Sequence, residues 1–421
     1  MFAKLQFLFT DPGIRARLLF VIGAFVVFRV LAAIPMPGID AFQLQQFLEN
    51  NQFFGLLNIL SGSGLSTLSL VMLGVGPYIT ASIIFQLATV IVPKLKELQQ
   101  EGGEEGRRKI TQWGRIVTFP LALIQGFSLL LILAQQGVID PLSGFSLVLA
   151  LLTVAAGTYL LMWIGEMVSE RGIGNGLSLI IFAGIVAVLP QQIAQYFFAF
   201  DASQVPTLIA FVAVGIITIL GVVYFTEAER PIAVQYARQA RGGATYGSTQ
   251  TYLPIRVTLA GVMPIIFALT LFTFPQLFAT LLATSTNGIL AGIASGITTF
   301  FQNQWLYGAA YFLLVFFFTF FYTAVVFEPE KVSENLQKGG GFIPGIRPGK
   351  PTTEYIGDVV SRVTFVGALF FAIIAVLPVI LTAITGNQSL ALGGTALLIV
   401  VSVVIDLIKK VDAQLSLREY Q

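Results

Sequence analysis

The chain has 421 residues, of which 56% are hydrophobic and only 10% are charged, and its net charge is +2. This composition excludes a soluble globular protein with an ordinary charged surface and indicates a membrane protein with several spans. Cysteine and histidine are both absent, which excludes disulfides, thiol nucleophiles and the usual zinc, haem and copper ligand sets. We therefore expect a protein that is not an enzyme and that needs neither a metal nor a cofactor.

Ten apolar runs are long enough to cross a bilayer, whose hydrocarbon core of about 30 Å takes about 20 helical residues. The runs predict an all-α fold of ten transmembrane helices, at residues 18–36, 71–92, 116–136, 145–165, 173–195, 206–225, 257–282, 306–327, 363–384 and 391–408. Every lysine and arginine except Arg29 lies before the first run, after an even-numbered run or at the C-terminus. By the positive-inside rule, both termini face the cytoplasm. The first run has the length of a span, so we expect it to be retained rather than cleaved as a signal.

The stretch that precedes the second run differs from the rest of the chain. Residues 61–70 are rich in glycine and serine, and as a helix they would extend only about 15 Å at 1.5 Å per residue. Half-length backbone at membrane depth is tolerated only where protein covers it or where it lines a water-filled cavity. The sequence therefore predicts a re-entrant half-helix that enters the membrane, returns, and borders a cavity.

A short internal repeat indicates two related halves. Gly74-Val-Gly-Pro-Tyr-Ile79 in the second run and Gly261-Val-Met-Pro-Ile-Ile266 in the seventh share the pattern Gly-Val-x-Pro-x-Ile. These runs are the second members of two groups of five, and a repeat with an odd number of spans inserts its second copy upside down. We expect an N-terminal half at residues 1–200 and an inverted C-terminal half at 201–421, with prolines that permit bending where the halves meet.

The polar residues give little evidence for nucleotide chemistry or ion-coupled transport. Gly172-Ile-Gly-Asn-Gly176 lacks the spacing of a phosphate-binding loop and predicts a tight cytoplasmic turn capped by Asn175. An ion-coupled transporter carries an acid near the midplane of a span, whereas Glu166 and Asp406 lie at cytoplasmic ends. For Arg29, inside the first run, two readings stay open: it is functional, or it extends outward or pairs with a buried carbonyl.

Two cytoplasmic connections, residues 226–256 and 328–362, are longer than a link between adjacent helices requires. They are expected to project as binding surfaces; the alternative is that they serve only as charged topology anchors. In the second connection, residues 342–349 read Phe-Ile-Pro-Gly-Ile-Arg-Pro-Gly. This is the pattern of a stiff turn that presents Arg347.

Isoleucines are paired on single helix faces in two of the predicted spans. Ile79 and Ile83 are four residues apart in the second run, as are Ile181 and Ile185 in the fifth, so each pair shares one face. Taken alone, this spacing is more typical of core packing than of a site.

Five segments resemble the SecY family, the pore-forming subunits of bacterial protein translocases. They follow the family order along nearly the whole chain, at residues 76–84, 104–110, 165–190, 335–349 and 393–400. The chain departs from the family pattern at residues 167–169, Ala228 and Pro231. The departures concern the detail of loop partners and leave the fold unaffected.

The resemblance implies a clamshell of ten spans in two inverted five-helix halves, with a central hourglass pore and a re-entrant plug helix. The second and seventh spans would line a lateral gate toward lipid. The implied apolar pore ring consists of Ile79, Ile83, Ile181, Ile185, Ile266 and Ile399. The implied plug consists of Ser61, Gly62, Ser63, Gly64, Leu65, Ser66, Thr67, Leu68, Ser69 and Leu70.

The function that the resemblance implies is a protein-conducting channel in the cytoplasmic membrane. Such a channel passes unfolded secretory polypeptides and releases transmembrane segments laterally into the lipid bilayer. Arg238, Arg241 and Arg347 would dock the ribosome or the motor ATPase SecA, beside the small subunits SecE and SecG. An apolar ring gates ions by dewetting, and a wall without fixed charges binds no side chain too tightly.

Two other classes of protein compete with this interpretation. A secondary transporter of a small solute also has inverted repeats and broken helices, but the missing midplane acid and the two large cytoplasmic loops argue against it. A purely structural membrane subunit leaves the half-helix at residues 61–70 unexplained.

Overall fold

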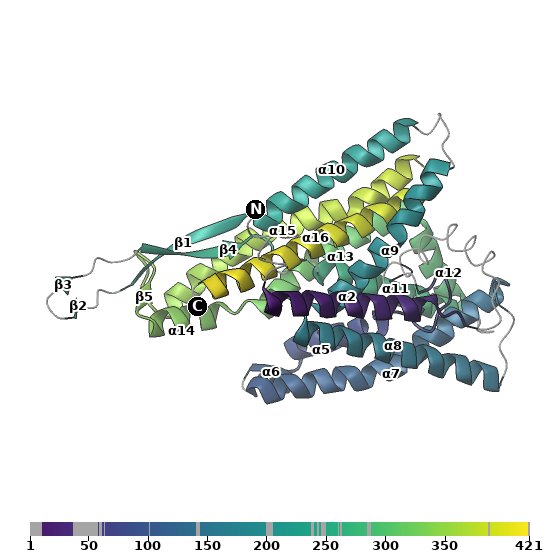
Figure 1. The fold of residues 1–421 in the computed structure, drawn as a ribbon, viewed down its shortest axis with the longest axis horizontal. Helices are drawn as coiled ribbons and strands as arrows, with labels where there is room; N and C mark the ends of the chain where they lie inside the picture. Colours follow the sequence, from purple (N-terminus) through teal and green to yellow (C-terminus); the bar gives the residue numbers. More distant parts are fainter. Residues whose placement is uncertain are drawn as a thin grey trace.

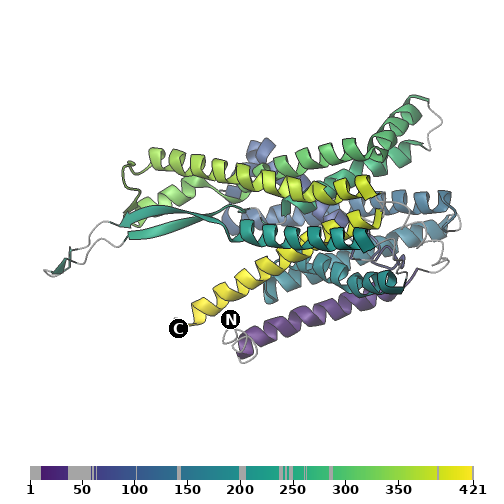
Figure 2. The same cartoon turned by 90° about the horizontal axis from the view of Figure 1, so that it is seen from above.

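The computed structural model describes residues 11–36, 58, 61–62, 64–100, 102–139, 144–198, 205–236, 240–241, 244–245, 250–259, 261, 263–283, 288–385 and 388–419. Long helices lie side by side along the long axis of the molecule, and a narrow β-structure projects from one end (Figure 1). The start of the first described helix and the end of the last both lie toward that end (Figure 2).

Each of the predicted apolar runs falls on one helix. These helices are α2 (Pro12–Ala33), α5 (Gly76–Ile91), α7 (Gly103–Gln135), α8 (Phe145–Arg171), α9 (Gly176–Phe198), α10 (Val205–Glu227), α11 (Met263–Ala283), α13 (Gln304–Val326), α15 (Lys350–Thr385) and α16 (Gln388–Glu419). Among the described residues, 5 helices are long and apolar enough to cross a membrane, or 6 if α5 and α6 (Pro93–Gln100), bent by 107°, form one span. Parts of α9, α10 and α11 are shorter apolar helices. The chain is a multi-pass membrane protein.

Local sequence explains where several of these helices begin. The Asp11 carboxylate accepts a hydrogen bond from the Gly13 N–H at 2.7 Å and caps α2. As the sequence predicted, the Asn175 side chain caps α9, accepting from the Leu177 N–H at 3.1 Å. Such caps satisfy backbone donors that lack a partner inside the helix.

The two copies of the Gly-Val-x-Pro-x-Ile repeat share the backbone conformation of their first glycine and the position of their helix start. Gly74 and Gly261 both have a φ of +58°, a region that glycine enters without steric cost. Helices α5 and α11 each begin two residues later, at Gly76 and Met263. The prolines thus occupy the first helical turn, where no backbone N–H is required. They fit the helix start, and the role of these prolines in bending stays a prediction.

The two long connections, residues 226–256 and 328–362, contain strands that were not predicted from the sequence. β1 (Glu229–Tyr236) lies between β4 (Gln250–Arg256) and β5 (Gly341–Phe342), so both long connections contribute to one antiparallel sheet. The hairpin also carries β2 (Ala240–Arg241) and β3 (Ala244–Thr245). Ile232 and Val234 are buried on alternate positions of β1, and this period of two was the available signal.

Two further helices lie outside the predicted runs. α14 (Pro329–Lys338) follows α13 along the chain, and α12 (Gly288–Gln302) lies between α11 and α13. α12 is apolar but has only 15 residues, too few to span a bilayer. It packs against α11, so α11 has a short helix beside it in addition to the predicted spans.

Candidate functional site

The six isoleucines of the predicted ring all belong to one large buried core cluster, which also contains many other residues. They come from α5, α9, α11 and α16, and each is at most 4% exposed. Ile79 and Ile266 both occupy the fourth position of their helices, the equivalent place in the two repeat copies. Four helices from different parts of the chain thus contribute these residues to the same apolar core, while their role as a pore ring stays a prediction.

The predicted plug segment is compact but is not helical. Residues 61–62 and 64–75 form consecutive turns, which corrects the expected half-helix. Positive φ angles at Gly62 and Leu68, 65° and 39°, interrupt helical geometry. Serine side chains also compete for the backbone: the Leu65 N–H donates to Ser61 Oγ at 3.2 Å, and Ser69 Oγ donates to the Gly64 carbonyl at 3.0 Å. Ser63 lies outside the described residues.

Backbone hydrogen bonds hold this segment to the end of α2. The Met36 N–H donates to the Leu68 carbonyl at 3.0 Å, and the Leu70 N–H donates to the Ile34 carbonyl at 3.2 Å. Thr67 Oγ1 donates to the Ala32 carbonyl at 2.8 Å. A left-handed leucine is costly and persists where surrounding contacts fix it, so these bonds explain why Leu68 keeps its conformation.

Close backbone contacts hold the plug segment against α8 and α9. A Cβ at Gly184 of α9 would overlap the backbone of Gly62, and a Cβ at Gly157 of α8 would overlap the carbonyl of Leu70. Only glycine permits this approach. Leu65 and Leu68 are 0% and 1% exposed and pack into a cluster that includes residues of α7. The segment therefore fills the interior of the bundle.

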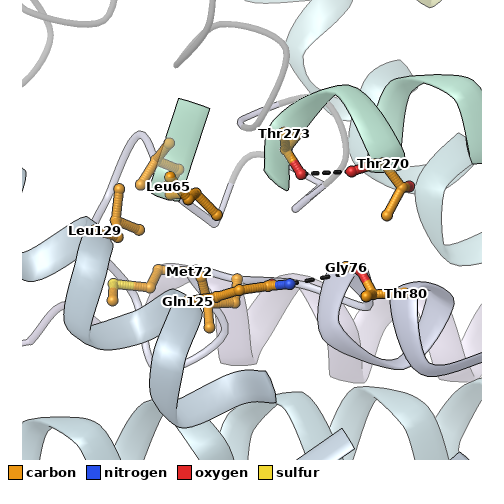
Figure 3. A pocket seen from close by; sticks show the side chains of 10 residues that line it. Leu65, Met72, Gly76, Thr80, Gln125, Leu129, Thr270 and Thr273 are labelled. Carbon is orange, nitrogen blue, oxygen red and sulfur yellow. Dashed lines mark hydrogen bonds between the residues drawn. The ribbon is translucent and has the colours of Figure 1, made fainter. Parts of the chain in front are cut away.

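A polar seam lies where α5 and α7 face α11. Gln125 Nε2 donates to Thr80 Oγ1 at 3.5 Å, and across a cavity of about 20 Å³ Thr273 Oγ1 donates to the Thr270 carbonyl at 2.6 Å (Figure 3). This cavity has room for one water molecule. Leu65 of the plug segment also lines it (Figure 3). The first bond joins α7 to α5 and the second lies within α11, so neither hydrogen bond ties the two sides of the seam together.

Sequence reasoning missed these seam residues. Gln125, Thr80, Thr270 and Thr273 are single polar residues inside apolar runs. The available signal was their position at membrane depth, where polar side chains usually face the bundle interior.

Glu166 is part of an ionic contact that joins three helices. Its Oε1 lies 2.8 Å from Arg115 Nε of α7 and accepts a hydrogen bond from the Tyr78 hydroxyl of α5 at 3.4 Å. The Tyr159 hydroxyl of α8 donates to the Arg115 carbonyl at 2.6 Å. A carboxylate paired in this way serves as a structural tie between helices. Arg29 is exposed on α2, as its outward-extending interpretation requires.

Arg347 lies in a turn with a tightly specified backbone. Gly345 and Gly349 have φ angles of 82° and 99°. Thr352 Oγ1 donates to the Arg347 carbonyl at 2.9 Å, and Ser333 Oγ of α14 donates to the Gly349 carbonyl at 3.1 Å. The Arg347 side chain is exposed. The loop therefore presents a guanidinium from a fixed backbone, as the sequence predicted.

The other charges of the two long connections are less completely described. Arg238 lies outside the described residues, and for Arg241 only the backbone, in β2, is described. On α14, Lys338 Nζ lies 2.7 Å from Glu334 Oε1. The hydrogen bond that Lys338 donates lowers the pKa of the Glu334 carboxyl. The docking role of the three arginines stays a prediction.

Comparisons with known proteins agree with this geometry. The SecY family model matches residues 69–408. The protein translocase subunits SecY of Streptomyces scabiei and Mycobacterium bovis are each 39% identical to the chain. The first alignment covers 98% of this chain and 97% of its relative, the second 97% and 96%.

Solved structures show the same fold at lower sequence identity. A protein-conducting channel is 18% identical with a TM-score of 0.67, covering 96% of this chain and 93% of that one. A structure concerned with the plug domain of the SecY protein has a TM-score of 0.66 at 19% identity, covering 96% and 92%. Sec61 in a canine ribosome-channel complex has a TM-score of 0.62 at 18% identity, covering 96% and 93%. The chain belongs to the SecY family.

Proposed function

We propose that this chain is the channel-forming subunit of a protein translocase, which passes unfolded secretory polypeptides and releases transmembrane segments into lipid. One observation carries the proposal: a glycine-rich segment made of turns is held inside a helix bundle, with Gly62 against Gly184 of α9, the helix that carries Ile181 and Ile185 of the six buried isoleucines. Its relatives that are 39% identical over nearly the whole chain are protein translocase subunits. The function is passage rather than catalysis.

The channel is closed in two ways. The plug segment occupies the bundle interior, and the ring of Ile79, Ile83, Ile181, Ile185, Ile266 and Ile399 excludes ions because an apolar constriction dewets. A translocating chain displaces the plug segment and threads the ring. Because the ring has no fixed charge, it holds no particular side chain strongly.

Lateral release takes place through the seam between α5 and α11. Neither hydrogen bond described at the seam crosses from α5 to α11, so neither is lost when the two helices part. A sufficiently apolar segment then leaves because lipid solvates it better than water does. When the two helices part, the side chains of Thr80, Gln125 and Thr270 would face the open passage.

The chain is organised as two inverted halves, residues 1–200 and 201–421. The matching conformations of Gly74 and Gly261, and the equivalent positions of Ile79 and Ile266, support this division. The distribution of lysine and arginine supports a cytoplasmic position for both termini in the cytoplasmic membrane.

The projecting sheet, α14 and the Arg347 turn form the surface for cytosolic partners. The sheet combines both long loops, so a partner can contact Arg347 and the β1–β4 hairpin together. The motor ATPase SecA and the ribosome are the proposed partners, with Arg238 and Arg241 as further contacts. One structural neighbour is a channel bound to a ribosome. SecE and SecG are proposed as the small membrane subunits.

A reconstitution experiment tests the proposal. The chain is co-expressed with SecE and SecG homologues, purified and placed in vesicles with SecA, ATP and a radiolabelled secretory precursor. We expect the small subunits to co-purify and the precursor to become protected from protease, dependent on ATP. If an assembled complex protects no precursor under conditions in which a known translocase does, the proposed function is wrong.

A further inference from the structure

Helices α11, α12 and α13 enclose an apolar groove of about 420 Å³, a volume typical of small-molecule sites. Its lining consists of Leu271, Phe272, Pro275, Gly296, Ile297, Phe300, Phe301, Ala310 and Leu314. On α11 the groove is lined by Leu271, Phe272 and Pro275, and the seam is lined by Thr270, Thr273 and Leu277. At 100° per residue, these two sets lie on faces of α11 about 180° apart. The groove is therefore behind the gate helix and separate from the proposed passage.

The groove lies within one leaflet of the bilayer. Trp305, 69% exposed at the start of α13, is the kind of residue that marks a membrane interface. Ala310 and Leu314 follow it by five and nine residues, which places them about 7.5 and 13.5 Å deeper. Half of the hydrocarbon core is about 15 Å. Pro275 is nine residues, about 13.5 Å, from Ile266. With Ile266 in a ring at the bilayer midplane, this distance also places Pro275 within one leaflet. This second estimate alone rests on the proposed function.

Exposed apolar side chains neighbour the lining residues along α12 and α13, on a surface that would face lipid. Next to the lining residues, Ile293 of α12 is 49% exposed, and Leu313 and Phe317 of α13 are 51% and 64% exposed. Water is a poor occupant because apolar cavities stay dry. A polypeptide helix, about 10 Å across, would fill the volume with about one turn. A flexible hydrocarbon chain fits both the shape and the surroundings.

We propose that this groove binds an acyl chain of a bilayer lipid. Its inner wall is preformed: the Phe272 ring lies 5.3 Å from that of Phe301 and 5.2 Å from that of Tyr307, both edge to face. Phe300 and Phe301 are also edge to face, at 5.4 Å. Edge-to-face pairs are favourable, so these side chains are already ordered. Binding of a chain in the groove then costs little further side-chain entropy. A bound acyl chain would support the back of α11, the helix that carries Ile266 and one side of the seam.

The test uses a phosphatidylcholine with a diazirine midway along one acyl chain. The full chain is reconstituted into nanodiscs that contain this lipid, irradiated, and analysed by mass spectrometry to locate the modified residues. A variant that fills the groove is Gly296→Leu, since a Cβ at Gly296 meets no atom within 4 Å. Gly292→Leu, one turn earlier on α12 and equally unobstructed, is the matched control outside the lining. Both changes raise helix propensity equally.

In the parent and in Gly292→Leu, we expect the groove residues to be modified several-fold more than the exposed face of α10. In Gly296→Leu, modification of the groove should fall to the α10 level. Equal modification of groove and α10 in the parent would reveal only ordinary surrounding lipid and overturn the proposal, as would unchanged labelling in Gly296→Leu. If Gly296→Leu fails to fold, Ala310→Leu fills the groove from α13. None of these readouts depends on translocation, so failure here is distinct from failure of the proposed function.

Discussion

Replacing Gly184 by alanine tests how the plug segment is held. The new Cβ would overlap the Cα, the carbonyl carbon and the carbonyl oxygen of Gly62. Because these are backbone atoms, no side-chain rotation relieves the overlap. The clash exists only while the plug segment is seated against α9, so it destabilises the seated state and leaves the displaced state unaffected.

The size of the effect follows from the cost of overpacking, about 1–3 kcal/mol. Alanine also favours the helix by about 1 kcal/mol over glycine, but this gain is the same whether the plug is seated or displaced. Since 1.4 kcal/mol is a factor of ten, the displaced fraction should rise between about fivefold and about 100-fold. If the plug seals the resting channel, ion leak rises with it.

The assay is resting conductance in planar bilayers, with thermal unfolding of the same preparations. Gly292→Ala is the control, because no atom lies within 4 Å of a Cβ there. We expect a leak from Gly184→Ala that Gly292→Ala does not show. Gly157→Ala, which meets the Leu70 carbonyl, should leak as well. If Gly184→Ala and Gly157→Ala both show the conductance and the unfolding temperature of the parent, the plug segment has no sealing role.

Three other predictions follow from the same model of the channel. Changing Ile83 and Ile185 together to serine should raise resting ion conductance, because hydroxyls in the constriction hold water; unchanged conductance in a folded protein would remove these residues from the ring. Arg347→Glu should leave insertion intact but slow SecA-driven transport, at a cost of about 2–5 kcal/mol if the contact is desolvated; transport at the parental rate and matched protein level would show that Arg347 is only a topology charge. Single cysteines, simple to introduce because the chain has none, should react at Gln337 only from the cytoplasmic side and at Asn287 only from outside; labelling of both from one side contradicts the ten-span topology.

The helices were predictable because a bilayer imposes a length and a composition on every span. Charge placement gave their expected orientation, and each predicted run falls on a helix. The short helix α12 was missed because its 15 residues fall below span length. The sheet was missed because strand pairing joins residues far apart in the sequence, such as Gln235 and Phe342.

The candidate site was predictable in part. Isoleucines at a spacing of four marked the helix faces that meet in the core, although spacing alone does not distinguish a ring from ordinary packing. The plug segment was identified by its length and its glycines, but its turns depend on hydrogen bonds to the end of α2. The seam depends on which faces of α5, α7 and α11 meet, which is a property of the assembled bundle.

The central claim, that a polypeptide passes through the isoleucine ring, is tested most directly by photocrosslinking. A photoreactive amino acid replaces Ile185 in the ring or, as a control, Leu220, which is 64% exposed on α10. A secretory precursor is then arrested in transit by a folded domain at its C-terminus and the sample is irradiated. We predict a crosslink from position 185 to the arrested precursor and none from position 220. A precursor that is arrested in transit but crosslinks at 220 and not at 185 would show that it takes another path and would contradict the account.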